Sequence, residues 1–407
     1  MRLLRKIPYP KVGWGPSPRT GTAQVHFDPK RFSMLGRAGW TATYRPSGAV
    51  SDLTMGRRRL LFSETSQQIR ELNETAGLIW DGLAGGLTPA VVSARLADSG
   101  TTAEEAAAFV DGLLQQWLSG GELYPDCVEE ARRSPEAVAP FASGGLSLAV
   151  GLHGGTLRED FAAVFGQFSG PVGAETPSDY QLVESEGFAF LFRGERCLGA
   201  APEGGAMPLL KGVLTEAVID SLEAGFAAHA GCLVRGDAAW LLAGSPGAGK
   251  TTLCAALAAK GFRYATDDVS LVDAAGEVSG VPFALAVKAG SWPLLEPMLP
   301  ALACARTHLR ADGQEVRYVL PPDGVTRKAA RLQTVIALAR EAGATARLDV
   351  VDPADMLAIL LAESYAPSRS LTAAQFEITG QAISAARCCK LTYSDLAEAV
   401  ELLSGGP

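Results

Sequence analysis

The sequence has few metal-binding or redox-active residues for its length. Seven cysteines are spread over 407 residues, and none forms a CxxC pair or stands at zinc-finger spacing from a histidine. We interpret them as core or incidental thiols in a reducing compartment, and we expect no structural zinc site. The sequence also lacks an apolar run of the roughly 18 to 20 residues that cross a bilayer, and its amino terminus lacks a signal-peptide core. We therefore expect a cytoplasmic protein without a membrane partner.

Charged residues are also scarce and unevenly placed. They make up 20% of the chain against 47% apolar residues, which excludes disorder as the main state and allows full-sized cores. Residues 1–60 hold twelve Lys or Arg and two Asp or Glu, a net charge of +10. The total is −8, so the remaining residues carry −18. This acidic majority argues against a protein whose whole surface binds nucleic acid.

Composition divides the chain into four parts. Residues 1–40 are rich in Pro, Gly and Arg, which predicts an irregular basic arm. Residues 41–125 hold the patterns of three short strands and three helices, which predicts a small α+β domain of winged-helix size. Residues 126–136 are acidic and unpatterned, as in a linker. Residues 137–407 alternate strand and helix patterns, which predicts an α/β domain.

The helices of the first domain have clear start signals. Thr88 is placed to cap the second helix, and Thr102 with Glu105 forms a capping box for the third, which runs through Trp117. Gly120-Gly121 then stops that helix, although Leu118 to Glu122 imitates a transporter ATPase signature. The expected strands are Thr41–Arg45, Val50–Met55 and Arg58–Phe62, and the first helix has an apolar stripe from Leu72 to Leu83.

A complete phosphate-loop motif lies in the second domain. The residues satisfy G-x-x-x-x-G-K-[ST] between an apolar strand, Ala238–Ala243, and an alanine-rich helix, Thr252–Lys260. Backbone amides of such a loop surround phosphate, the lysine neutralises the β and γ phosphates, and the threonine hydroxyl binds Mg²⁺. The expected nucleotide-binding residues are Gly244, Ser245, Pro246, Gly247, Ala248, Gly249, Lys250, Thr251 and Thr252.

Two adjacent acids follow the loop. Asp267 and Asp268 end a short extended run, Phe262–Ala265, that is expected to lie beside the phosphate-loop strand. Neighbouring side chains at a strand end point to opposite sides, so one carboxylate can serve a metal and the other an incoming hydroxyl. His229 lies just before the strand that precedes the phosphate-loop strand, and it is a third candidate catalytic residue. A long helix is expected over 209–228.

These three elements resemble the core of the HPr kinase/phosphorylase family. His229-Ala230, the phosphate loop and Thr266-Asp267-Asp268 recur there in this order, with Ala in place of Thr266. The resemblance implies the P-loop α/β fold shared with phosphoenolpyruvate carboxykinase, with ATP and Mg²⁺ as cofactors. It implies that Asp267 is the catalytic base, that Asp268 and Thr251 hold Mg²⁺, and that His229 positions Asp267.

The departures from that family bear on the activity. The segment around Lys288 keeps a cation but lacks the family's glutamate, and no segment tied to phosphorylase activity is visible. The resemblance therefore implies a kinase only, with a substrate other than the HPr protein.

The first domain is similar to the PqqD family, on Leu72 to Ala76, Ile79-Trp80, Thr88 and the third helix. That family recognises leader segments of ribosomally made peptides, so the resemblance implies a peptide held as an added strand between the third strand and the third helix. Arg57, Arg58 and Arg59 would favour an acidic leader. The expected peptide-binding residues are Arg58, Arg59, Leu60, Leu61, Phe62, Phe109, Leu113 and Trp117.

The sequence thus favours a leader-guided, ATP- and Mg²⁺-dependent kinase that phosphorylates a serine of a precursor peptide, lasso-type by family resemblance. Two alternatives stay open: a nucleotide-gated peptide chaperone that transfers no phosphate, and a kinase that phosphorylates a small molecule. A DNA partner is disfavoured because the third helix carries Glu104, Glu105 and Asp111 and no Lys or Arg. A homo-oligomer is compatible with the sequence, which shows no interface.

Overall fold

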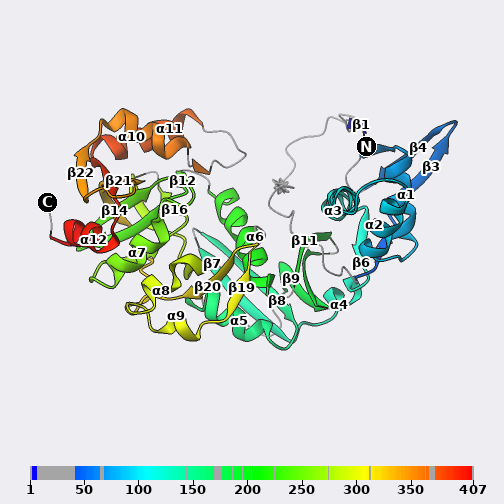
Figure 1. The fold of residues 1–407 in the computed structure, drawn as a ribbon, viewed down its shortest axis with the longest axis horizontal. Helices are drawn as coiled ribbons and strands as arrows, with labels where there is room; N and C mark the ends of the chain where they lie inside the picture. Colours follow the sequence, from blue (N-terminus) through cyan, green and yellow to red (C-terminus); the bar gives the residue numbers. More distant parts are fainter. Residues whose placement is uncertain are drawn as a thin grey trace, which may run out of the picture.

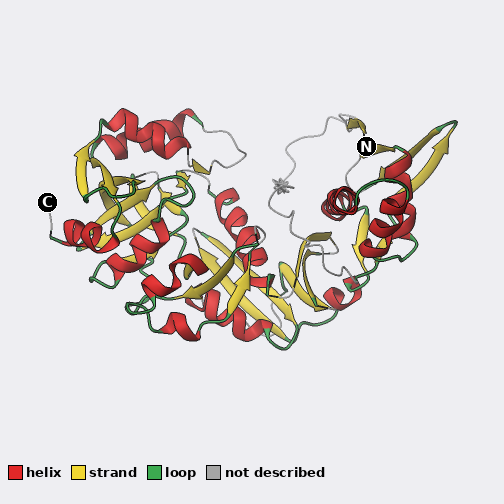
Figure 2. Cartoon of the chain, in the orientation of Figure 1, coloured by secondary structure: helices red, strands yellow, loops and turns green. Residues whose placement is uncertain are grey.

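The computed structural model gives a mixed α/β chain whose amino-terminal and carboxyl-terminal elements lie at opposite ends (Figures 1 and 2). Of the predicted arm only β1 (Arg2–Lys6) is described; the rest lies outside the described residues. Within the described part, no helix combines the length and apolar character needed to cross a bilayer. The structure describes residues 2–6, 42–64, 68–143, 145–168, 177–185, 187–194, 196–202, 204–222, 225–273, 275–310, 313–362, 364–365 and 372–405.

Helix starts and stops in the amino-terminal part follow the sequence signals. Thr88 accepts a hydrogen bond from the amide of Val91, and the capping box of Thr102 and Glu105 is formed. Gly121 ends the third helix in the left-handed region (φ 73°), which confirms the predicted glycine stop. The three helices are α1 (Glu74–Ala84), α2 (Pro89–Asp98) and α3 (Ala103–Gly120).

The strands of this part differ from the prediction in number and order. A strand that the sequence did not predict, β5 (Gln68–Leu72), joins the sheet, whose order is β1-β5-β4-β3. The strand predicted at Arg58–Phe62 is therefore paired on both sides and is not an edge. The other strands are β3 (Val50–Met55) and β4 (Arg58–Ser63), and β2 (Tyr44–Pro46) pairs separately with β6 (Leu123–Pro125).

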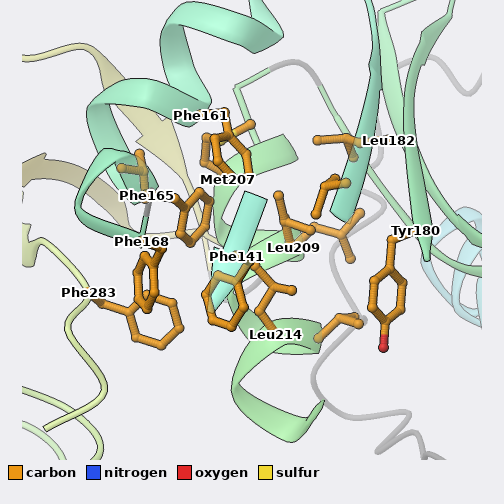
Figure 3. Packing of buried hydrophobic residues seen from close by; sticks show 14 of the residues in the cluster. Phe141, Phe161, Phe165, Phe168, Tyr180, Leu182, Met207, Leu209, Leu214 and Phe283 are labelled. Atoms are coloured by element: carbon orange, nitrogen blue, oxygen red, sulfur yellow. The ribbon is translucent and has the colours of Figure 1, made fainter. Parts of the chain in front are cut away.

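A five-stranded sheet in the middle of the chain is covered on both faces. Alternate residues face opposite sides, so Leu191 packs in one apolar cluster while Phe190 and Phe192 pack in the other. Helix α5 (Leu157–Phe165), η2 (Gly166–Phe168) and α6 (Ala206–Asp220) supply the first cluster, where Figure 3 shows Phe141, Phe165, Phe168 and Phe283 gathered. The strands are β7 (Ala137–Ser143), β8 (Leu146–His153), β9 (Tyr180–Ser185), β10 (Phe188–Arg193) and β11 (Arg196–Pro202).

The second cluster joins the amino-terminal part to this sheet. It combines Trp80, Leu114 and Trp117 with Phe190 and Phe192 in one continuous core. The predicted linker 126–136 contains a short helix, α4 (Val128–Arg132), rather than an extended spacer. Removing residues 1–125 would therefore expose buried aromatic side chains of this sheet.

A ten-stranded sheet carries the phosphate-loop motif. Three of its strands lie parallel: β14 (Ala238–Ala243), β21 (Ala330–Arg340) and β24 (Arg387–Tyr393). Two helices contribute to one apolar cluster, α7 (Lys250–Ala258) and α12 (Leu396–Ser404). Two others contribute to a second cluster, α10 (Pro353–Ala362) and α11 (Ala373–Ser384). Its other strands are β12 (Phe226–Ala228), β13 (Gly231–Arg235), β15 (Arg263–Thr266), β16 (Ser270–Val272), β17 (Glu277–Gly280), β22 (Arg347–Val350) and β23 (Ser364–Tyr365).

The helix predicted over residues 209–228 ends earlier in the structure, so its predicted end is wrong. Helix α6 stops at Asp220, and β12 then leads to His229.

A small sheet beside the phosphate-loop helix completes the described fold. It contains β18 (Leu285–Lys288), β19 (Thr307–Leu309) and β20 (Glu315–Val319), with η3 (Ala289–Ser291), α8 (Trp292–Leu295) and α9 (Ala301–Cys304).

Candidate functional site

The phosphate-loop segment connects β14 directly to α7. Gly244, Gly247 and Gly249 have φ angles of 156°, 90° and 95°, values that side-chain-bearing residues rarely adopt. A Cβ atom on Gly249 would also lie 2.7 Å from the hydroxyl oxygen of Tyr393. Residues 245–247 are exposed, so the loop amides at the start of α7 are open to an anion.

The first turn of α7 carries the polar side chains of the motif. Lys250 is 7% exposed, and its Nζ donates to the carbonyl of Gly244, which holds the ammonium group under the loop. The hydroxyl of Thr251 donates to Asp267 Oδ2 at 2.7 Å. Thr252 turns the other way and shares a hydrogen bond of 3.1 Å with Ser291 in η3.

Asp267 is a buried carboxylate fixed by hydroxyl groups. It follows β15, is 3% exposed, and accepts a hydrogen bond from Tyr264 at Oδ1 (2.8 Å). Tyr264 also donates to the carbonyl of Phe283. Burial, together with the negative charge of Asp267, keeps the pKa of Tyr264 well above its usual value, so the phenol stays a donor. Asp267 and Thr251 thus form one connected pair beside the phosphate loop.

Asp268 has different partners from its neighbour. Its Oδ2 lies 2.5 Å from the Nζ of Lys211, and its Oδ1 lies 3.0 Å from the Nδ1 of His229. Burial opposes ionisation of this carboxyl, but Lys211 and His229 outweigh that effect and hold its pKa well below the usual range. Its side chain is 26% exposed, so the carboxylate is reachable from solvent.

His229 lies beside the second of the two acids. The structure places the imidazole against Asp268, whereas Asp267 is held by Tyr264 and Thr251. Strand β12 leads directly to His229. The expected positioning of Asp267 by His229 stays a prediction.

Lys211 is a site residue that the sequence reasoning missed. It lies on α6, and its whole side chain is close to fully buried beside Asp268 and 5.0 Å from the centroid of the Phe283 ring. The available signal was a single lysine within the otherwise apolar run Met207–Leu214. A motif search does not find it because β12, β13 and β14 lie between it and the loop.

The oxygen atoms present fit a magnesium ion held together with nucleotide phosphates. Thr251 and Asp267 offer one hydroxyl and one carboxylate, the hard ligands that Mg²⁺ takes when substrate and water complete its shell. Asp268 fits less well than expected because an ammonium group already lies on its Oδ2. Among described residues, no cluster of three or more His, Cys, Asp or Glu side chains could hold a metal ion alone.

The predicted peptide-binding residues are not gathered on one exposed surface. Leu61 and Trp117 are core residues, 1% and 0% exposed, while Phe109 is 55% exposed. Leu60, Phe62 and Leu113 are half-buried.

Two of the three arginines predicted to attract an acidic leader, Arg58 and Arg59, are already paired. Arg58 donates twice to Glu71, and Arg59 contacts both Asp52 and Asp81. Their charge is therefore largely offset within the protein itself.

No protein-family model matches the chain, and no curated protein matches it. Among solved structures, the chain is similar to the Hpr(Ser) kinase/phosphatase from Coxiella burnetii, at 13% sequence identity and a TM-score of 0.21. The match covers 44% of this chain and 91% of that chain. A TM-score of this size does not establish a common fold, although the mixed α/β architecture is compatible with a kinase-like one.

Proposed function

We propose that the protein is an ATP- and Mg²⁺-dependent kinase that phosphorylates a hydroxyl group. One observation carries the proposal: Thr251, in the first turn after the phosphate loop, is hydrogen-bonded to Asp267, and a second, solvent-reachable carboxylate follows at once in the chain. Phosphoryl transfer needs a phosphate cradle, a metal position and a group that accepts the hydroxyl proton. These residues supply all three at neighbouring positions.

The nucleotide end of the site consists of the loop amides and Lys250. The amides bind phosphate oxygens, and the ammonium group of Lys250 moves from the Gly244 carbonyl to the β and γ phosphates. Thr251 and Asp267 hold Mg²⁺, which neutralises charge on those phosphates when bound. In this assignment the metal-binding acid is Asp267, not Asp268 as the family resemblance implied.

The acceptor end consists of Asp268 and His229. Asp268 accepts the proton of the attacking hydroxyl, and His229 fixes the direction of its Oδ1. The new bond forms between the acceptor oxygen and the γ-phosphorus, and the bond to the β–γ bridging oxygen breaks. ADP leaves with that electron pair, and Asp268 later releases the proton to water.

We further propose that the acceptor is a serine of a ribosomally made precursor peptide, lasso-type by the sequence resemblance, and that its leader takes the place of β1 beside β5. The support is the backbone of β5, which already pairs along its outer edge with β1 in antiparallel register. An extended peptide fits such an edge through main-chain hydrogen bonds. Exposed Phe109 on α3 offers an apolar contact for the same peptide. Docking raises the local acceptor concentration to the millimolar range.

Intact-mass measurement of candidate precursor peptides tests this function. With ATP and magnesium, the wild-type protein should add the mass of one phosphate, and Lys250→Ala should add none while still binding leader. Full transfer by Lys250→Ala would show that the phosphate-loop assignment is wrong.

A nucleotide-gated peptide chaperone is the second candidate. The observation that favours it is that both oxygens of Asp268 are occupied, which suits a switch that does not transfer phosphate. Asp268→Asn separates the two functions: a kinase loses product, whereas a switch keeps ATP-dependent peptide binding. A small-molecule kinase would instead phosphorylate its substrate without any leader.

A further inference from the structure

A buried lysine faces the proposed acceptor end from α6. Lys211 is 7% exposed, and its ammonium nitrogen lies 2.5 Å from Asp268 Oδ2. Its aliphatic neighbours on the helix, Leu210 and Leu214, belong to the apolar core. A lysine buried this far is rare and is held only by pairing, because its desolvation is costly.

A purely structural salt bridge is a poor explanation for this placement. Replacing a buried ion pair with well-packed apolar residues is often neutral or stabilising, so stability alone does not require a lysine in an apolar helix. Its partner is also not a structural acid. The Asp268 side chain is 26% exposed, and Asp268 follows Asp267, which contacts the phosphate-loop threonine.

Two lysines and two aspartates lie around the loop. Lys211 pairs with Asp268, whereas Lys250 donates to the Gly244 carbonyl and has a neutral partner there. A bound ATP adds negative charge, and more of it develops on the leaving and transferring groups during the reaction. A cation positioned in a water-poor site stabilises that charge far more than it would in water.

We propose that Lys211 is a second catalytic lysine, which moves from Asp268 Oδ2 to an oxygen of the transferring phosphoryl group. The move has two effects. It neutralises charge on the phosphoryl group, and it frees Asp268 Oδ2 to take the hydroxyl proton. The flexible four-carbon stem of lysine permits this exchange, since the ammonium group is a point charge with rotatable donors. This inference rests on the proposed kinase function.

Ligand binding tests the inference without measuring turnover. The probes are Mg·ADP, which represents the ground state, and Mg·ADP with aluminium fluoride, which mimics the transferring phosphoryl group. Lys211→Met should bind Mg·ADP within about threefold of wild type and lose about 100-fold in affinity for the fluoride complex, the usual effect of removing one transition-state donor. Lys260→Met, exposed at the far end of α7, is the matched control and should change neither affinity.

A second pair of variants guards against misfolding of Lys211→Met. Asp268→Asn leaves the lysine in place, and Asp268→Asn with Lys211→Met removes both charges together, so that no buried charge is left unpaired. Asp268→Asn should keep or improve binding of the fluoride complex, and the double variant should lose it.

Three results would overturn the inference. Equal affinity of Asp268→Asn and the double variant for the fluoride complex would show that the lysine does not touch the phosphoryl group. Equal losses for both ligands in Lys211→Met would show a general binding or structural role. If the wild-type protein binds neither ligand, the proposed kinase function itself is wrong. This failure differs from the other two, because both of them are seen only when the wild-type protein binds the ligands.

Discussion

The phosphate-loop site and the amino-terminal sheet obtain their geometry in different ways. Around Lys250 the important conformations are local, because a glycine-rich turn between a strand and a helix fixes the loop amides and the first-turn side chains together. In the amino-terminal sheet the important property is strand order, which puts β1 and β3 at the edges and β5 and β4 between them. Local geometry can be inferred from a motif, whereas strand order depends on pairing between distant segments.

The two regions also differ in how their adjacent charged residues are paired. Asp267 and Asp268 are near neighbours in sequence yet have separate sets of partners, which gives each a distinct task. Arg58 and Arg59 are also adjacent, but both pair with acids on β3, β5 and α1 of the same region, so neither is reserved for a ligand. Adjacent charges therefore indicate function only when their partners lead to an open site.

The largest expected effect tests which of the two acids, Asp267 or Asp268, binds the metal. Asp267→Asn should lower the rate of phosphate transfer by about 10³-fold and raise the magnesium concentration needed, because the metal position loses its charge. Steady-state assays across a magnesium series measure both quantities. Asp349→Asn, an exposed acid, is the control and should behave as wild type. An unchanged magnesium requirement in Asp267→Asn would return the metal role to Asp268.

The next effect concerns stability of the amino-terminal sheet. Arg70 on β5 pairs at 2.9 Å with Glu122, whose side chain is 1% exposed and whose pKa is raised by burial. Arg70→Ala should destabilise the protein by about 3 kcal/mol, since it leaves a buried carboxylate without its cation. Urea unfolding measures the change. A double variant, Arg70→Leu with Glu122→Leu, should recover most of it, and failure to recover would show that the pair is not the cause.

A smaller effect depends on pH. Burial raises the pKa of Asp111 on α3 to about 7, so between roughly pH 4 and 7 the folded state keeps a proton that the unfolded state has released. This stabilising contribution is complete below the unfolded pKa and is lost as the pH rises through 7. Asp111→Asn should therefore stabilise the protein by about 1 kcal/mol at pH 8, a value reduced because the side chain is partly exposed, and by less at pH 5.

The control for that measurement is exposed Asp98, whose replacement by Asn should give the same small change in unfolding free energy at both pH values. Equal stabilisation by Asp111→Asn at pH 5 and pH 8 would contradict the explanation by burial.

The smallest effect tests which edge accepts a peptide. Strand β1 occupies the outer edge of β5, and a tethered five-residue strand competes with an added peptide at an effective concentration in the millimolar range. Deleting residues 1–6 should tighten leader binding by about threefold, measured by fluorescence anisotropy of a labelled peptide. Arg58→Ala should leave the affinity within twofold. A large loss in Arg58→Ala would favour the charged surface instead of the edge.

Much of the candidate site was predictable from the sequence. The phosphate loop, the flanking strand and helix and the acidic pair follow from residue types at fixed spacing, because their chemistry needs those residues in that order. The helix starts at Thr88 and Thr102 were predictable for the same reason. Each of these features depends on contacts within a few residues.

The remaining features needed the tertiary structure. Lys211 reaches Asp268 only because α6 packs beside the ten-stranded sheet, and His229 contacts the same acid because β12 replaces the end of the helix that periodicity predicted. The interior position of β5 similarly follows from its pairing with β4 and β1. These contacts join segments far apart in the sequence, so no local pattern specifies them.

The central claim, that the loop around Lys250 binds ATP with magnesium, is tested most directly by calorimetric titration. The wild-type protein should bind Mg·ATP with one site per chain, and Lys250→Ala should bind it at least about tenfold more weakly, since the lysine supplies a cation to the β and γ phosphates. Equal affinity in the two proteins, or no binding by the wild type, would contradict the account.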